Sequence, residues 1–368
     1  MSKPLILAGL LVLAVLAGCS QPQSTVPDVP VPVPAAYTVP AVPKVDVKDL
    51  LADHAKFVTA NNERAANKPT HESARVDLLA HFASYGLTAV RFNFTDGIPQ
   101  ADIIGVKWGV DRQNWVFVGG HYDTITDDCL VGKVPVVNQP NPCVARSISQ
   151  GAYDDGSGTM MTVHLAKTFA NLTPYYTIAF VAFDGEERGI QGAAALVSAI
   201  QEKNFTVDGI HPTIVADLDL DMIGLNWPGV NAPINMLTNS EKAGQLVLAK
   251  AKEMGFPDDQ IIDKPGLKLG SSDYAAFWGI KDPAPVPTVF FISDFEELGA
   301  PAPAPDQAQT PIGAYPFWHL EDTVETMTAM AGGPANLEAG FQSASDLAGY
   351  ILHVMAYQPS VTLDATPK

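Results

Sequence analysis

The sequence predicts an α/β fold of three layers, α/β/α, with a central mixed, largely parallel and twisted sheet. Three observations predict it. Strand patterns alternate with helix patterns along the globular part of the chain, as in domains whose parallel strands are joined by helices. The run Tyr176–Phe183 is nearly all apolar, which is typical of a strand buried on both faces. His and carboxylate residues stand where apolar runs end, at the sheet edge where α/β folds expose their chemistry.

Each element is predicted from its local pattern. Apolar residues at three-to-four spacing predict helices, and the helical segments are expected at 45–60, 72–85, 157–171, 189–202, 240–254, 322–330 and 344–357. Short apolar or alternating runs predict strands at 88–93, 103–108, 115–118, 176–183, 213–220, 234–238 and 288–292. A Gly-Ser-Gly turn opens the third helix, and a long loop at 124–151 precedes it.

The composition limits the classes of function. The chain has 368 residues, of which 47% are hydrophobic and 17% charged. This length allows one large domain or two ordinary ones, and the composition supports a sizeable core and argues against global disorder. The net charge of −18 argues against nucleic acid and anionic membrane surfaces as partners. An acidic excess is also what keeps many exported proteins soluble.

The first residues have the features of an export signal. Lys3 gives a short basic start, and the apolar run from Leu5 to Gly18 is too short to span a bilayer. The run ends in Leu-Ala-Gly-Cys19, which resembles the cleavage box of bacterial lipoproteins. The resemblance implies that residues 1–18 are removed and that a lipid on Cys19 is the only membrane attachment. We therefore expect a lipid-anchored protein of the bacterial cell envelope; an ordinary signal peptide with an incidental Cys is the alternative.

Proline and cysteine positions divide the rest of the chain. Residues 19–45 contain Pro at 27, 30, 32, 34, 40 and 43, so we expect an extended tether before a globular domain at 46–368. Cys129 and Cys143 lie in one Pro-, Asn- and Val-rich loop. In an oxidising compartment we expect them to form a disulfide that closes the loop, with two free thiols or a metal pair as the alternative.

Five positions are candidates for metal ligands, and each stands near the end of an apolar run or the start of a Gly-rich turn: His121, Asp154, one of Glu186 and Glu187, Asp221 and His319. Three carboxylates and two imidazoles suit a divalent metal and are typical of hydrolytic zinc. Asp123 can hold the second nitrogen of His121 and fix its tautomer. Of the adjacent residues Glu186 and Glu187, one can bind metal while the other faces substrate. Each fragment alone is usually structural; their joint occurrence in this order predicts a two-metal peptidase.

The fragments Gly-Gly-His121-Tyr-Asp123, Gly-Ala-Tyr-Asp154-Asp155, Phe-Asp-Gly-Glu186-Glu187, Leu-Asp-Leu-Asp221 and Phe-Trp-His319 resemble the motifs of the co-catalytic di-zinc exopeptidases. This family includes bacterial leucyl aminopeptidases, glutamate carboxypeptidase and glutaminyl cyclases. The resemblance covers roughly residues 45–357 and implies a zinc-exopeptidase fold of the phosphorylase/hydrolase type with two Zn²⁺. It implies that His121 and Asp221 bind one zinc, Glu187 and His319 the other, and that Asp154 bridges both. The Asp154–Asp155 peptide is expected to be cis.

The resemblance also implies a mechanism. A zinc-bridging hydroxide would attack the N-terminal peptide bond of a peptide with a free N-terminus, and Glu186 would be the general base. The charges agree with this, because three ligand carboxylates and one hydroxide balance two Zn²⁺ ions. Tyr274 stands where the family most often has the His of a Ser-Asp-His motif, so its phenol can donate to the oxyanion or simply pack near Phe277 and Trp278. We expect a monomer.

One departure and several rivals remain open. Two residues rather than the usual three separate His319 from Asp322-Thr323. The ligand is still expected to bind, but the loop that follows it departs from the family's pattern. A carboxypeptidase or N-acyl amino-acid deacylase could use the same site, with Arg146 and Arg188 as the nearby candidates for a substrate carboxylate. A glutaminyl cyclase-type transferase and a non-catalytic binding lipoprotein are further alternatives. The remaining histidines are expected to be structural or at the surface: His54, His71, His81, His164, His211 and His353.

Overall fold

The computed structural model describes residues 37–66, 68–125, 149–226, 234–256, 272–293 and 322–366, and the backbone of 261–262. Several predicted features lie outside these residues: the signal segment with Cys19, most of the tether, Cys129, Cys143, Arg146 and His319. Residues Ala35–Lys368 form one compact unit. None of the helices within the described ranges combines the length and apolar composition needed to cross a membrane.

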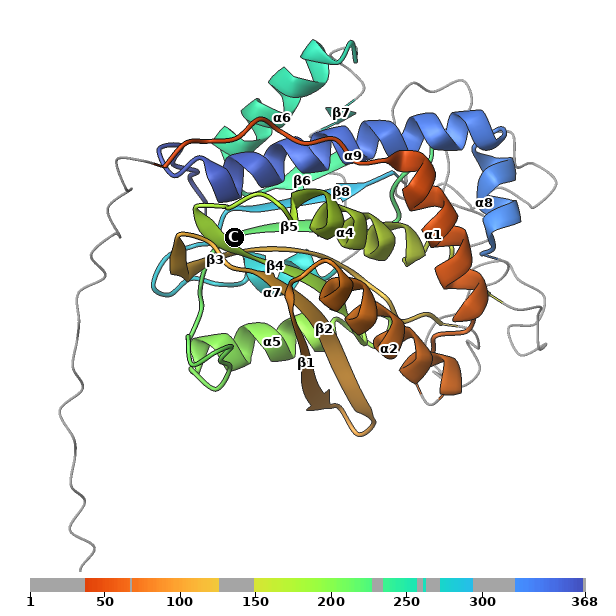
Figure 1. The fold of residues 1–368 in the computed structure, drawn as a ribbon, viewed down its shortest axis with the longest axis horizontal. Coiled ribbons are helices and arrows are strands. Elements are labelled where there is room, and N and C mark those ends of the chain that lie inside the picture. The colour runs from red at the N-terminus through yellow and green to blue at the C-terminus, as the bar shows by residue number, and fades with distance from the viewer. Residues whose placement is uncertain are drawn as a thin grey trace, which may run out of the picture. The chain divides into compact units, whose positions relative to one another are not determined.

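A mixed sheet forms the centre of the fold (Figure 1). The described strands lie in the order β1-β2-β4-β3-β5-β8-β6-β7. The inner pairs β4/β3, β3/β5 and β5/β8 are parallel, whereas β1/β2, β2/β4 and β6/β8 are antiparallel. The predicted α/β class with a mixed central sheet is therefore confirmed. The strands are β1 Thr88–Thr95, β2 Pro99–Lys107, β3 Asp111–His121, β4 Tyr176–Phe183, β5 Thr213–Leu220, β6 Ile234–Thr238, β7 Ile261–Ile262 and β8 Thr288–Ile292.

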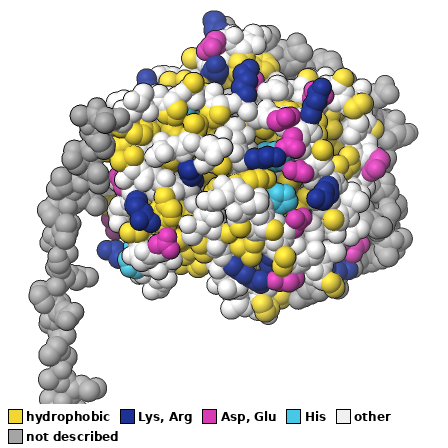
Figure 2. Space-filling view, viewed as in Figure 1, with side chains coloured by type: hydrophobic (Ala, Val, Ile, Leu, Met, Phe, Trp, Pro, Cys, Tyr) yellow, Lys and Arg dark blue, Asp and Glu magenta, His cyan; other side chains and the backbone are white. Residues whose placement is uncertain are grey.

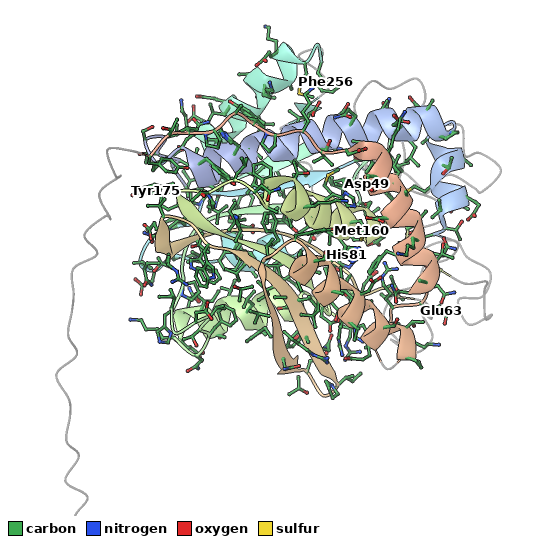
Figure 3. All side chains as sticks on the ribbon, viewed as in Figure 1. Asp49, Glu63, His81, Met160, Tyr175 and Phe256 are labelled. Carbon is green, nitrogen blue, oxygen red and sulfur yellow. The ribbon has the colours of Figure 1, made fainter. Side chains whose placement is uncertain are left out.

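Helices cover both faces of the sheet (Figure 1). One face carries a large apolar core that contains Met160, whose side chain is labelled in Figure 3; the helices on this face are α1 Val47–Ala60, α2 Pro69–Ser84, α4 Gly156–Phe169, α6 Glu241–Glu253 and α9 Pro334–Tyr357. A smaller core around Phe117 and Phe277 lies under α5 Gln191–Gln201 and α7 Tyr274–Trp278 on the other face. The short helix α8 Val324–Met330 precedes α9.

The predicted boundaries of the elements agree best with the observed boundaries for the buried strands. β4, β5, β6 and β8 begin and end where the apolar runs predict. The largest difference is α9, which begins at Pro334 instead of 344. Pro fits the first turn of a helix, because its missing N–H would have no helical partner there. Leu337 and Phe341 continue the buried face of α9 at helical spacing, a signal that the surrounding polar residues and Gly340 obscured.

The end of the expected tether lies against the globular domain. The red segment before α1 runs along α9 in Figure 1. Tyr37 Oη donates to the carbonyl of Tyr357 at 3.3 Å, and His353 Nε2 donates to the carbonyl of Pro40 at 2.8 Å. Val45 is buried. Proline keeps this segment extended and leaves its carbonyls free for such contacts.

The surface carries both signs of charge. On the face that Figure 2 shows, Lys and Arg side chains are scattered among acidic and apolar side chains. This distribution differs from the concentrated basic patch that would mark a nucleic-acid-binding face.

The burial of His54 leads us to expect that the free energy of unfolding depends on pH. Its ring is buried, and Nε2 donates to the carbonyl of Ala152 at 2.6 Å. Burial lowers the pKa of His54 to about 4. Because the unfolded state binds the proton at a higher pH, the free energy of unfolding should fall as pH drops from about 6.5 to 4, by up to about 3 kcal/mol.

Urea unfolding with a chelator present, repeated across this pH range, measures the effect. In His54→Gln an amide replaces the imidazole and can still donate, so its stability should vary less with pH than that of the wild type. The same substitution at the exposed His211 serves as the control. A pH profile that His54→Gln leaves unchanged would show that this imidazole does not titrate in the expected range.

Candidate metal centre

β3 delivers His121 to the carboxyl edge of the sheet. The ring is 1% exposed, and its Nδ1 lies 3.1 Å from the carbonyl of Asp123. A carbonyl can only accept, so Nδ1 carries a proton and Nε2 points to the neighbouring carboxylates. The carboxylate Oδ1 of Asp123 lies 3.5 Å from Nδ1 and accepts the N–H of Glu186 at 3.1 Å. Asp123 thus connects the loops that follow β3 and β4.

Asp154 reaches His121 through the turn that begins α4. Asp155 caps this helix by accepting the N–H of Gly158 at 2.7 Å. A Cβ on Gly158 would lie 1.9 Å from the carbonyl oxygen of Leu220, so only Gly lets the helix start this close to the end of β5. The peptide bond between Asp154 and Asp155 is cis, as predicted.

Three of the predicted ligands converge. His121 Nε2 lies 3.0 Å from Asp154 Oδ1 and 3.7 Å from Asp221 Oδ1, and the three ligand atoms all lie within 4.8 Å of one another. Tetrahedral zinc with ligands at its usual distances would separate them by about 3.4 Å. Asp221 Oδ1 is buried and accepts no hydrogen bond from the described residues. The donor set therefore fits a divalent cation such as zinc.

The electrostatics of this cluster also favour a cation. Burial lowers the pKa of His121, but the carboxylates of Asp123, Asp154 and Asp221 outweigh it and raise the pKa well above its ordinary value. The metal-free imidazole therefore keeps its second proton to a higher pH than an ordinary histidine. A metal must displace this proton to bind Nε2, so metal affinity should increase with pH.

Glu186 lies beside the three ligands, in the turn that follows β4. Its Oε2 is 4.0 Å from His121 Nε2, and its side chain is 13% exposed. Burial raises the pKa of Glu186 well above its ordinary value; the charge of His121 opposes this, and the carboxylates of Glu187, Asp221 and Asp154 add to it. Glu187 is half-buried. Its negative charge raises the pKa of Glu186, as expected for two adjacent carboxylates.

A buried network fixes the start of this turn. The carboxylate of Asp184 accepts hydrogen bonds from His71 at 2.8 Å, Arg75 at 2.7 Å and Tyr122 at 2.7 Å. It also accepts the N–H of Ala101 at 2.8 Å. Asp184 precedes Glu186 by two residues, and Tyr122 follows His121 directly. The network therefore holds the turns after β3 and β4 together.

Of the predicted site residues Tyr274 and His319, Tyr274 lies in the described part of the chain and its surroundings can be given. Tyr274 is 6% exposed, and its ring stacks on Phe290 with centroids 4.6 Å apart and contacts Trp278 edge-on at 5.7 Å. Its N–H donates to Asp219 at 2.8 Å. These contacts account for its packing, and its contact with an oxyanion stays a prediction. His319 lies outside the described residues, so its ligand role also stays a prediction.

Sequence reasoning missed the residues that support the site from outside the motifs. Asp184 could have been found, because it stands in the Phe-Asp-Gly-Glu-Glu fragment. Asp322 was noted only for its spacing, yet its carboxylate accepts the N–H of Tyr153 at 2.9 Å and of Asp154 at 2.8 Å. His71 and Arg75 had no signal, because the sequence separates them from the site by dozens of residues.

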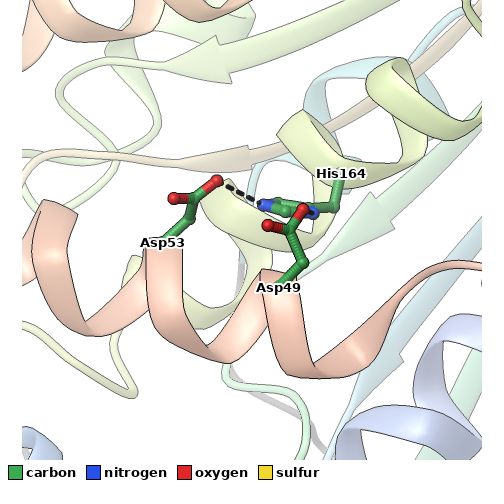
Figure 4. A group of neighbouring side chains, drawn as sticks. All are labelled: Asp49, Asp53 and His164. Carbon is green, nitrogen blue, oxygen red and sulfur yellow. Dashed lines mark hydrogen bonds and ion pairs between the residues drawn. The ribbon is translucent and has the colours of Figure 1, made fainter.

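A second group of His and carboxylate side chains joins α1 and α4 (Figure 4). His164 points between two acidic residues: its Nε2 lies 3.2 Å from Asp53 Oδ2, and its Nδ1 lies 3.7 Å from Asp49 Oδ2. The ammonium of Lys167 donates to the same oxygen of Asp49. Since a cation of the chain already pairs with this carboxylate, we interpret the group as a polar contact between helices.

Comparison with known proteins identifies the family to which this chain belongs. The model of peptidase family M28 matches residues 102–331, a range that contains the three converging ligands and Glu186. The chain belongs to peptidase family M28. A probable zinc metalloprotease of Pyrenophora tritici-repentis is 34% identical over 119 residues, 32% of this chain and 23% of that protein. The aminopeptidase YwaD of Bacillus subtilis is 27% identical over 188 residues, 50% of this chain and 34% of that protein. The chain thus matches only about a quarter to a third of these relatives' lengths.

Solved structures share the fold of this M28 protein. A zinc aminopeptidase from Bacillus subtilis has a TM-score of 0.60 at 15% identity, over 88% of this chain and 98% of that one. A glutaminyl cyclase from Porphyromonas gingivalis has a TM-score of 0.60 at 16% identity, over 84% and 98%. At these identities the likeness shows the fold, which a hydrolase and a cyclase have in common.

Proposed function

We propose that this M28 protein is a zinc-dependent exopeptidase, and specifically an aminopeptidase. The observation that carries the proposal is the convergence of His121, Asp154 and Asp221, with Glu186 4.0 Å from the imidazole. Membership of a peptidase family and the names of the matched relatives, a zinc metalloprotease and an aminopeptidase, support it. We further propose two zinc ions, the second held by Glu187 and His319 with Asp154 shared.

The residues of the chain have distinct parts in the proposed reaction. Bound zinc would supply a Lewis acid that polarises the scissile carbonyl and acidifies water. Glu186 accepts a proton from the attacking water and returns it to the leaving amine. A cation beside Glu186 favours its carboxylate form, against the burial that raises its pKa. Asp123 orients His121 and the backbone of Glu186 together.

The environment favours a substrate with a free N-terminus over one with a free C-terminus. A carboxypeptidase needs a cation for the substrate carboxylate, and of the two arginines predicted for this role, Arg188 lies in the described residues. Its Nε and Nη2 both lie 2.8 Å from Asp96 Oδ2. Since this guanidinium is already paired, and since carboxylates surround the site, an ammonium group is the better electrostatic match.

A panel of substrates tests the proposal. We expect the zinc-loaded protein to hydrolyse aminoacyl amides and peptides with a free N-terminus. It should leave N-acetylated peptides and N-acyl amino acids intact. A chelator should abolish the activity and added zinc should restore it. Cleavage only of N-blocked substrates would establish the deacylase or carboxypeptidase alternative. Conversion of N-terminal Gln to a pyroglutamyl residue that stays on the peptide, with release of ammonia, would establish the cyclase.

A further inference from the structure

Arg64 is a buried cation with an unusual set of partners. It lies in the segment between α1 and α2 and is 0% exposed. Its guanidinium donates only to backbone carbonyls in the described residues: Nε to Tyr122 at 2.5 Å, Nη1 to Gln150 at 2.5 Å, and Nη2 to Gly151 at 2.9 Å. Buried arginines normally pair with a carboxylate. The use of all three nitrogens on carbonyls indicates that the position of the backbone is what Arg64 controls.

The three carbonyls belong to the two segments that bring the metal ligands together. Tyr122 stands between His121 and Asp123 at the end of β3, and the other two carbonyls begin the stretch 150–154 that ends at Asp154. The planar guanidinium therefore cross-links these two segments. His121 Nε2 and Asp154 Oδ1 face each other at 3.0 Å beside this cross-link.

Asp322 holds the stretch 150–154 through its N–H groups. Its carboxylate accepts from Tyr153 and Asp154, and its carbonyl accepts from Gln150 at 2.8 Å. Arg64 donates hydrogen bonds to carbonyls of this stretch, while Asp322 accepts hydrogen bonds from its N–H groups. The stretch is thereby fixed by charged groups from two distant parts of the sequence.

The charge of Arg64 matters as well as its shape. Burial lowers the pKa of Arg64 to about 10, against the pull of Asp322, Asp155, Asp123 and Asp154. The side chain is therefore a cation at neutral pH, and these four carboxylates lie within its field. Asp154 belongs to the metal cluster and Asp123 lies beside His121, so the positive charge of Arg64 offsets the repulsion between these like charges.

We propose that Arg64 is a positioning residue of the metal centre, which holds the backbones of His121 and Asp154 at the separation that a shared cation requires. This inference rests on the proposed zinc-dependent function. It adds to that function, because Arg64 lies outside residues 102–331, the range that the family model matches. The N-terminal segment is thus part of the machinery of this chain's metal site.

Zinc affinity of the full chain tests the proposal, measured by competition with a chelator at neutral pH. Arg64→Met keeps the length of the side chain and removes its charge and donors. We expect its dissociation constant for zinc to rise about 10- to 100-fold, the range for partners that orient metal ligands. Arg64→Lys keeps the charge without the planar fork, so its affinity should lie between those of Arg64→Met and the wild type.

Val247→Ala is the matched control for a loss of stability alone. Val247 is fully buried in α6, which packs on α9. Its truncation should lower the melting temperature and leave zinc affinity within twofold of the wild type. If Arg64→Met does not fold, Arg64→Lys carries the test, with affinity at least fivefold weaker than that of the wild type expected.

Two results would overturn the proposal: folded Arg64 variants that bind zinc within twofold of the wild type, or a control that loses as much affinity as they do. Failure of the proposed function would look different. In that case the wild type itself would neither bind zinc nor hydrolyse any substrate of the panel.

Discussion

Replacing Glu186 by Gln should lower kcat by about 10²- to 10⁴-fold, the contribution typical of a positioned general base. The amide has the same shape but cannot accept the proton of the attacking water. The side chain of Glu186 lies beside the ligand cluster, with Oε2 4.0 Å from His121 Nε2. The substitution should therefore leave KM and zinc content close to those of the wild type. Steady-state kinetics with an aminoacyl amide and metal analysis of the same sample measure the two effects.

The control for this variant is Glu253→Gln, which removes one carboxylate from the exposed end of α6 and should have normal kinetics. A Glu186→Gln protein that retains turnover within tenfold of the wild type would remove Glu186 from the base role. Loss of zinc together with activity would instead show that Glu186 is a ligand.

Asp154→Asn should have the largest effect on metal binding. Asp154 is the proposed ligand of both ions, and a neutral amide is a far weaker zinc ligand than a carboxylate. We expect affinity at both sites to fall by more than about 100-fold, beyond the range for groups that only orient ligands. Zinc per chain, measured after dialysis against a chelator of graded strength, reports each site.

Asp221→Asn is the matched comparison, because Asp221 is proposed to bind only one zinc. It should release one ion and retain the other. If Asp154→Asn also releases only one ion, Asp154 does not bridge. If both variants keep two ions, the ligand set inferred from the convergence with His121 is wrong.

The fold could be predicted from local pattern because burial on both faces leaves a strong signal. β4 and β8 are almost continuous apolar runs, and both were placed to the residue. The two-residue strand β7 and the five-residue helix α7 were not predicted. Elements this short bury too few residues to show a period in the sequence, and tertiary contacts decide whether they form.

The convergence of His121, Asp154 and Asp221 could be predicted, because each lies at the end of a strand or just before a helix, and parallel strands end at one edge of the sheet. The partners that hold the ligands could not. Arg64 donates to carbonyls, and carbonyls are present at every residue, so no side-chain pattern marks its targets. The orientation of His121 likewise depends on the Asp123 carbonyl as well as on its carboxylate.

The sequence by itself determined the fold class and the types of side chain available for a hydrolytic metal, because burial and chemical identity are properties of single residues and short runs. The tertiary structure alone decided which atoms meet, which arginine is already paired and which one cross-links the ligand loops. Distances between residues dozens of positions apart are set by packing across the whole sheet, and no local pattern in the chain encodes them.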